Sequence, residues 1–258
     1  MELIKISVYN EDSYEKSIME LFQTLGYSDY YGPDIERDYK NPLFKQDLEN
    51  LHRINKSLDS EAVDKTIESI QDLGIGSLED LNNKFMDYVQ NGVSINYWKD
   101  GEELSTHVKL VDFENMDSNL FTVINQWTVI DKETKRPDVV VFVNGIPLVV
   151  CELKSPSRED ADTSEAYTQL KKYMQVIPNL FYYNAFCVMS DLSISKAGTI
   201  TANEDRFMEW KTTDGSYEST QWADFTTFFE GIFEKNRFLD ILKNFITFSN
   251  DSTKKLKF

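Results

Sequence analysis

The stretch Lys135–Lys154, KRPDVVVFVNGIPLVVCELK, contains two apolar runs separated by an Asn-Gly pair. The runs Val139–Val143 and Leu148–Leu153 are rich in valine and bounded by polar residues, which is typical of buried strands. Asn144-Gly145 between them is a strong signal for a hairpin turn. The stretch therefore predicts a buried β-hairpin in a central sheet.

Charged residues stand at the open end of this hairpin. Asp138 opens the first strand, and Glu152 and Lys154 end the second on one face, with Leu153 pointing into the core. If Asp138 shares the face of Glu152, the two carboxylates would repel each other by about 4 kcal/mol at 4 Å in an effective dielectric near 20. A divalent cation would remove this repulsion by taking both as ligands. Lys154 would then lie beside the metal, placed to orient water or to stabilise a phosphate.

The register of the hairpin tests this idea. A regular two-residue turn would pair Asp138 with Cys151 and put Asp138 and Glu152 on opposite faces. A single bulge restores the shared face, and both Gly145 and Pro147 favour an irregularity. We therefore predict an irregular hairpin, and a regular one would count against a metal site.

The Glu-x-Lys pattern by itself is weak. It occurs also at Glu133–Lys135 and Glu209–Lys211, and the Pro-Asp pair occurs also at Pro33-Asp34. Only the stretch that ends at Lys154 has both patterns in order around two apolar strands. From the residues alone, two interpretations remain open: a metal-dependent site, or solvated charges at strand ends.

Outside the hairpin, apolar spacing predicts helices in the first 91 residues and mostly strands after them. The expected helices are 14–25, 44–58, 61–73, 78–88, 165–176, 225–233 and 238–248, and the further expected strands are 93–98, 107–113, 121–130 and 181–190. We therefore expect an α/β fold, a mixed central β-sheet flanked by helices, with a mostly helical N-terminal region. This single domain would comprise a helical region over residues 1–91, the α/β core over 92–200 and closing helices in 201–258, which end in a basic tail with Lys254, Lys255 and Lys257.

Composition excludes several classes of protein. The net charge of -17 excludes a polybasic nucleic-acid binder. Cys151 and Cys187 lie in apolar runs and fit buried thiols, and two histidines without a CxxC pair argue against structural zinc. The N-terminus lacks a signal-peptide pattern, and no apolar run approaches the roughly 20 residues of a membrane helix. We expect a cytoplasmic protein with no membrane partner.

The segment RPDVVVFVNGIPLVVCELKSP resembles the nuclease core at the N-terminus of the R (restriction) subunit of type I restriction–modification enzymes, which belong to the PD-(D/E)xK nucleases. QLKKYMQVIPNLFYYNAFCVMSD resembles the helix and strand that follow in that family, with its QxxxY motif as Gln169 and Tyr173. YEKSIMELFQTLGY resembles the family's opening helix and contains Glu15, and RFLDILKNFITF resembles the end of the nuclease region. The resemblance implies a PD-(D/E)xK restriction-endonuclease-like core.

The resemblance also implies a function. The family cleaves double-stranded DNA by Mg²⁺-dependent phosphodiester hydrolysis, after its complex has translocated along the DNA using ATP. The implied metal ligands are Asp138, Glu152, the Leu153 carbonyl and Glu15. The implied catalytic residues are Asp138, Glu152, Lys154, Gln169 and Tyr173. On the residues alone, Tyr173 also fits a buried helix face, and Glu15 also fits an exposed first turn.

The chain departs from the family in one respect, because it has no GxxxxGK[ST] phosphate loop. ATP would therefore act only in an absent motor, and the basic tail would begin the linker to it. The implied partners are double-stranded DNA and the methyltransferase and specificity subunits, and the isolated chain would cut poorly. Two alternatives remain: a stand-alone PD-(D/E)xK repair nuclease or junction resolvase, and a catalytically silent docking module derived from a nuclease.

Overall fold

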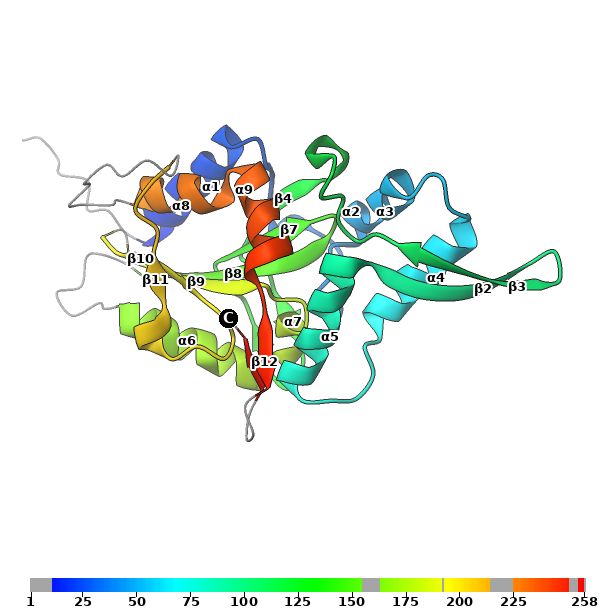
Figure 1. The fold of residues 1–258 in the computed structure, drawn as a ribbon. Coiled ribbons are helices and arrows are strands. Elements are labelled where there is room, and N and C mark those ends of the chain that lie inside the picture. The colour runs from blue at the N-terminus through cyan, green and yellow to red at the C-terminus, as the bar shows by residue number, and fades with distance from the viewer. Residues whose placement is uncertain (1–10, 155–162, 192, 214–224, 251–254, 258) are drawn as a thin grey trace, which may run out of the picture.

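A mixed seven-stranded sheet forms the centre of the fold in the computed structural model, which describes residues 11–154, 163–191, 193–213, 225–250 and 255–257 (Figure 1). The strand order is β1-β4-β7-β8-β9-β10-β11. Two neighbouring pairs are parallel, β1 with β4 and β8 with β9, and the others are antiparallel. The strands are β1 (Ser28–Tyr31), β4 (Phe121–Asn125), β7 (Val139–Val143), β8 (Ile146–Leu153), β9 (Phe186–Ser190), β10 (Ser195–Gly198) and β11 (Met208–Glu209). The predicted α/β fold with a mixed central sheet is confirmed.

Helices cover both faces of this sheet (Figure 1). On one side lie α1 (Glu11–Thr24), α8 (Phe225–Phe233) and α9 (Lys235–Asp240), and on the other lie α6 (Thr163–Val176) and α7 (Pro178–Phe181). The N-terminal region adds α2 (Lys45–Leu48), α3 (Asn50–Ile54), α4 (Ser60–Gln71) and α5 (Leu78–Asn91). Within the described residues, every helix is too short or too polar to cross a lipid bilayer.

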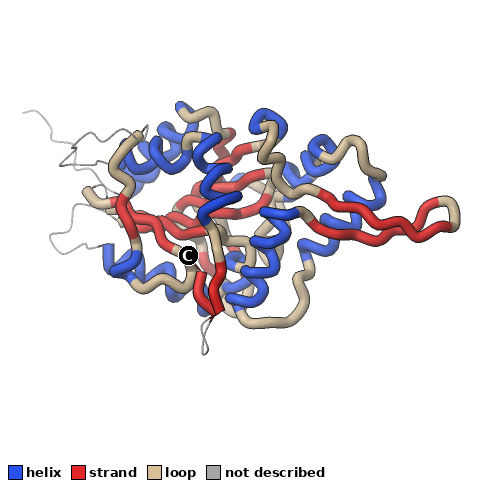
Figure 2. The backbone as a smooth tube through the Cα atoms, in the orientation of Figure 1, coloured by secondary structure: helices blue, strands red, loops and turns tan. Residues whose placement is uncertain are grey.

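Further two-stranded pairs stand outside the central sheet, and the β2–β3 pair projects clearly from the body in Figure 2. They are β2 (Val93–Lys99) with β3 (Glu102–Val108), β5 (Val129–Ile130) with β6 (Thr134–Lys135), and β12 (Phe248–Asn250) with β13 (Lys255–Lys257). Short 3-10 turns span Gly32–Asp34, Met116–Ser118 and Glu204–Arg206, and a π-helical turn spans Ile241–Phe245.

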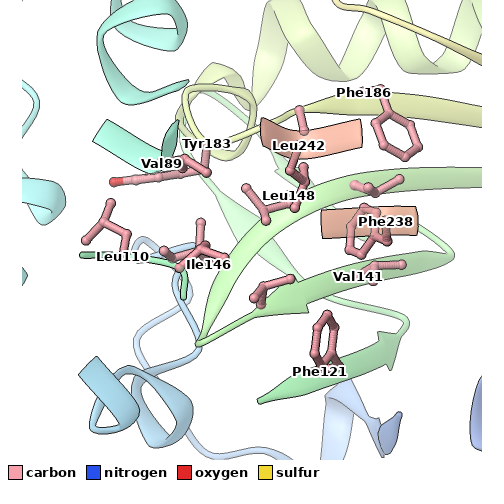
Figure 3. Close-up of a cluster of buried hydrophobic side chains, with 14 of the residues drawn as sticks. Val89, Leu110, Phe121, Val141, Ile146, Leu148, Tyr183, Phe186, Phe238 and Leu242 are labelled. Carbon is pink, nitrogen blue, oxygen red and sulfur yellow. The ribbon is translucent and has the colours of Figure 1, made fainter. Parts of the chain in front are cut away.

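The central hairpin β7–β8 is buried on both of its faces. Figure 3 shows one face, where Val141, Ile146 and Leu148 pack with the side chains of neighbouring strands and of the C-terminal helices. On the other face, Val140 and Val150 join the cluster beneath α6. Every residue of both strands is buried, which explains the nearly continuous apolar sequence of this hairpin.

The hairpin is irregular, as its sequence predicts. Val143 pairs with Ile146 and Phe142 with Pro147, but Val141 pairs with Val149, so Leu148 is the extra residue of a bulge. Beyond the bulge Val139 pairs with Cys151 instead of Val150. The bulge therefore moves every later residue of β8 to the other face relative to β7.

The turn that closes the hairpin is buried and locked in place. Asn144 and Gly145 have φ values of 50° and 78°, as a two-residue hairpin turn requires. The Asn144 side chain accepts a hydrogen bond from Leu120 N at 2.8 Å and donates to Leu110 O at 2.9 Å. Gly145 O accepts from Phe44 N at 2.8 Å, which ties the start of α2 to the turn.

Several predicted elements differ from those observed. The segment 107–113 is not one strand, because Asp100-Gly101 forms the turn of β2–β3 and the paired strand β3 ends at Val108. The segment 181–190 begins as helix, because Pro178 starts a new helix as well as ending α6. The predicted helix 44–58 is split into α2 and α3, and the predicted helix 238–248 ends in the π-helical turn before β12.

One lysine of the basic tail is built into the fold. Lys257 lies in β13 and is buried, with its ammonium group donating to Asn82 Oδ1 at 3.0 Å and Asn184 O at 2.6 Å. Burial lowers the pKa of Lys257 to about 7. Lys254 lies outside the described residues, as does the side chain of Lys255.

Substitution of Gly145 tests the locked turn. A Cβ at this position would lie 2.4 Å from Phe44 O and 2.8 Å from Leu48 N, so we expect Gly145→Ala to destabilise the domain by about 2–4 kcal/mol. Gly101→Ala is the matched control, since Gly101 also has positive φ but has no neighbour within 4 Å; its cost should stay near 1 kcal/mol. Urea unfolding measures both, and equal losses would show that the contact with α2 is unimportant.

Candidate functional site

The bulge brings Asp138 and Glu152 to the same face of the sheet. Asp138 directly precedes β7, and Glu152 is the next residue of β8 after the pair Val139–Cys151. Asp138 Oδ2 accepts a hydrogen bond from Leu153 N at 2.8 Å, so the two strand ends are fixed to each other. Leu153 itself is buried in the core on the opposite face, as its alternation with Glu152 predicts.

Lys154 completes this group. Its Nζ donates to Glu152 Oε1 at 2.6 Å and to Leu153 O at 3.1 Å. Its backbone N donates to Ser190 O at the end of β9, at 2.8 Å. The ammonium group, the Leu153 carbonyl and the Glu152 carboxylate therefore lie together at the C-terminal end of the central strand β8.

Burial distinguishes this Glu-x-Lys pair from the other two in the chain. All three form ion pairs, at 2.6 Å for Glu152–Lys154, 2.7 Å for Glu133–Lys135 and 3.2 Å for Glu209–Lys211. The Glu152 side chain is only 4% exposed, against 50% for Glu133 and 37% for Glu209. The interpretation as solvated strand-end charges therefore applies to the other two pairs and not to Glu152.

The Glu152 carboxylate is buried and the Asp138 carboxylate beside it is partly buried, which is electrostatically unfavourable unless a cation compensates their charge. Burial and then the charge of Glu152 raise the pKa of Asp138 to about 8. Burial also raises the pKa of Glu152, although Lys154 opposes this change. Burial by itself would lower the pKa of Lys154, but Glu152 outweighs it and the pKa is raised, so the lysine is cationic. With both carboxylates ionised, Asp138, Glu152 and Lys154 together carry two negative charges and one positive charge.

Helix α6 covers the site with Tyr173 and Gln169, which lie one turn apart. Tyr173 is buried in the cluster with Leu170 and Ile177, so the packing role expected from its spacing is real. Its pKa is raised by burial and by the charge of Glu152, and Gln169 acts on the same hydroxyl. Tyr173 therefore belongs both to the core and to the surroundings of Glu152.

Glu15 reaches the site only indirectly. Its Oε1 accepts from Asn125 Nδ2 at 2.6 Å and its Oε2 from Gln126 Nε2 at 2.5 Å. The acidic residue of α1 whose charge acts on Asp138, Glu152 and Lys154 is Glu11, one turn earlier. The sequence places an early glutamate on this helix but does not specify which turn faces the strands.

Gln126 is a neighbour of the site that sequence reasoning missed. It has a φ of 55°, which is uncommon for a residue with a side chain. Its backbone N donates to Asp138 O at 2.7 Å while its side chain holds Glu15. Gln126 thus connects α1 to the residue before β7, and its unusual backbone conformation marks a position under structural constraint.

The residues present fit a hard divalent cation. Tyr173 approaches Glu152 closely enough to lower the pKa of that carboxylate, yet the buried Oε2 atom has no hydrogen-bond partner of standard geometry. The atoms available as metal ligands are carboxylate and carbonyl oxygens, which Mg²⁺ prefers. Within the described residues of the chain, no three acidic, histidine or cysteine side chains form a metal cluster by themselves.

The raised pKa of Asp138 predicts a pH-dependent stability. Between about pH 4 and pH 8 the folded domain retains a proton that the unfolded chain has lost, so the free energy of unfolding falls as pH rises through this window. Asp138→Asn removes the titration and keeps an acceptor for Leu153 N. We expect a gain of about 1 kcal/mol or more at pH 8, or about 2–4 °C in Tm, with a smaller gain at pH 5. Thermal unfolding without metal measures it; Asp34→Asn, at the exposed second Pro-Asp pair, is the control. A loss of stability at pH 8 would contradict the electrostatic account.

Comparison with known proteins places the chain in a family. The family model described as type I restriction enzyme R protein N terminus matches residues 8–206. The type I restriction enzyme HindI endonuclease subunit of Haemophilus influenzae is 32% identical over 260 residues, which cover 95% of this chain and 25% of that protein. The putative type I restriction enzyme MjaIXP endonuclease subunit of Methanocaldococcus jannaschii is 28% identical, over 92% of this chain and 25% of that protein.

The chain spans about a quarter of the length of these curated relatives. The matched region includes the β7–β8 hairpin, the residues at its open end and the helix α6 that covers them. The sequence resemblance, the mixed sheet and the family match agree, and we conclude that the chain belongs to the family of type I restriction enzyme R protein N-terminal domains.

Proposed function

We propose that this domain is the Mg²⁺-dependent endonuclease domain of a type I restriction enzyme and hydrolyses phosphodiester bonds of double-stranded DNA. The observation that supports it most is the buried carboxylate of Glu152, which lies beside the partly buried Asp138 and the ammonium group of Lys154. Buried acids without compensation are costly, and such perturbed groups concentrate at functional sites. The family membership supports the same interpretation.

The proposed metal ligands are Asp138, Glu152 and the Leu153 carbonyl. When bound, Mg²⁺ would supply an activated water and offset negative charge on the phosphate. Asp138 is already oriented by Leu153 N, and Glu152 by Lys154. Since both oxygens of Glu15 accept hydrogen bonds from amide side chains, we assign Glu15 to positioning through Gln126 instead of direct ligation.

Lys154 would act on the scissile phosphate. Its raised pKa keeps Nζ protonated, so it cannot serve as a general base in this arrangement. An ammonium group at this place can stabilise the charge that develops on the phosphate oxygens. Gln169 and Tyr173 would close the α6 side of the site and limit the access of water to Glu152.

The rest of the proposed enzyme would supply what this domain lacks. A chain with a net charge of -17 gains little from counterion release on DNA, so other subunits would provide most of the DNA affinity. Methyltransferase and specificity subunits are the proposed partners, and ATP would act only in a motor region of the parent protein. The alternative of a silent docking module would require no metal at the strand ends.

Metal binding distinguishes the nuclease from that alternative. We expect saturable Mn²⁺ binding to the purified chain by calorimetry, since Mn²⁺ shares the oxygen preference of Mg²⁺. Glu152→Gln should abolish it or weaken it at least about tenfold, because one of two charged ligands is lost. Glu209→Gln is the matched control, as it removes an exposed member of the same sequence pattern.

Two results would contradict the proposed site. One is saturable binding that Glu152→Gln leaves unchanged, which would locate the metal elsewhere. The other is the absence of binding both to the chain alone and to the chain with a short DNA duplex, which would favour the docking module.

Lys154→Met separates metal binding from cleavage. The variant keeps a similar side-chain length but removes the charge, so Mn²⁺ affinity should be retained or increased as Glu152 loses its internal partner. Cleavage of circular plasmid by the reconstituted enzyme with ATP should fall about 10²–10³-fold, the usual cost of losing one charge-stabilising group. Lys211→Met, from the exposed pair, should cleave normally. Cleavage by Lys154→Met at the wild-type rate would exclude the catalytic role.

A further inference from the structure

The β2–β3 pair forms a ribbon that projects from the body of the domain (Figures 1 and 2). Its strands pair along their whole length, from Val93 with Val108 to Lys99 with Glu102. Asp100 and Gly101 close it at its tip with φ values of 53° and 88°. Neither strand pairs with any strand of the central sheet. A two-stranded ribbon is only marginally stable by itself, so its orientation requires support from the body.

One face of the ribbon provides that support. Val93 and Tyr97 are buried, and Ile95 between them is partly buried against the core. This face contacts α4. Near the tip, Lys99 Nζ forms an ion pair with Asp59 Oδ2 at 2.7 Å, and Asp59 is the N-cap residue of α4. The ribbon is therefore held along the helix at its base and close to its tip.

The opposite face of the ribbon is open to solvent. Alternation along the strands assigns six residues to it, and all of them are exposed: Ser94, Asn96, Trp98, Glu103, Ser105 and His107. Trp98 is 60% exposed and stands directly across from Glu103. A rigid tryptophan among serine and asparagine residues is the composition found in protein-binding loops. Tryptophan on an interface also contributes more binding energy than most residue types.

The charge at the tip indicates which surface this face would fit. Asp100, Glu102 and Glu103 are acidic, and the adjacent Lys99 is already paired with Asp59. These carboxylates would repel a nucleic-acid backbone, and with a net charge of -17 they disfavour a second copy of the chain. A guanidinium or ammonium group fits best, because it can stack on the indole ring while pairing with the carboxylate across the ribbon.

We propose that the β2–β3 ribbon is a docking element that places Trp98 and Glu103 against an arginine- or lysine-bearing surface of another protein subunit. That this subunit belongs to a restriction enzyme rests on the proposed function. The chemistry of the contact rests on the ribbon alone.

The test uses the R subunit that contains this chain and the remaining subunits of its enzyme. Trp98→Ala and Glu103→Arg should each weaken assembly at least about tenfold, measured by biolayer interferometry with the remaining subunits immobilised. The wild-type affinity should fall with added NaCl, and this dependence should be weaker for Glu103→Arg. Glu114→Arg is the matched control, since that carboxylate is 87% exposed and lies outside the ribbon; it should assemble normally.

Four further measurements keep the proposal separate from the nuclease site and from folding. Both variants should retain the wild-type Tm and the wild-type Mn²⁺ affinity, because neither residue lies in the core cluster or among the proposed metal ligands. Unchanged assembly in both variants would overturn the docking element while leaving the nuclease untouched. Weaker DNA binding with normal assembly, or altered self-association of the subunit in sedimentation, would assign the ribbon to DNA or to a second copy and would also overturn it.

Discussion

The bulge at Leu148 is the constraint on which the candidate site depends. Without it, the two-residue turn at Asn144-Gly145 would pair Asp138 with Cys151 and send the two carboxylates to opposite faces. With it, both carboxylates face α6, and Leu153 N can hold Asp138 Oδ2. The buried turn fixes the bulge from one end, since Gly145 has no room for a Cβ against Phe44 O. A one-residue slip of β8 would turn Glu152 toward the apolar face on which Leu153 now packs, and the cost of burying this charge opposes the slip.

The site is costly for the fold that carries it. The carboxylates of Asp138 and Glu152, both with raised pKa values, lie near the ammonium group of Lys154, and the buried Oε2 atom of Glu152 accepts no hydrogen bond of standard geometry. The surrounding structure holds them in place through many contacts. Lys154 N is bonded to Ser190 O, and the Ser190 hydroxyl lies 2.5 Å from both the Tyr14 hydroxyl of α1 and Ser195 Oγ of β10. The residues of functional sites often lower the stability of a fold, and contacts in the surrounding structure compensate for this loss.

The periphery of the domain shows two kinds of attachment. The strand pair β12–β13 is held by a buried lysine, Lys257, whose ammonium group satisfies Asn82 and Asn184 O. The ribbon β2–β3 is held along one face and leaves the other exposed. The first is an internal contact that stabilises the domain, and the second presents a surface, because a tryptophan exposed at the tip gains nothing from the fold itself.

The sequence by itself determined the α/β class, the central hairpin and the residues at its open end, because apolar runs and Asn-Gly turns act locally. It also predicted an irregular hairpin, because Gly145 and Pro147 favour a bulge and a regular two-residue turn would put Asp138 and Glu152 on opposite faces. The tertiary structure decided the rest. Burial separated Glu152 from Glu133 and Glu209, which have the same local pattern. Only packing of distant segments could bring Gln126 and Glu11 to the site and bury Lys257, because these contacts join residues that no short-range periodicity connects.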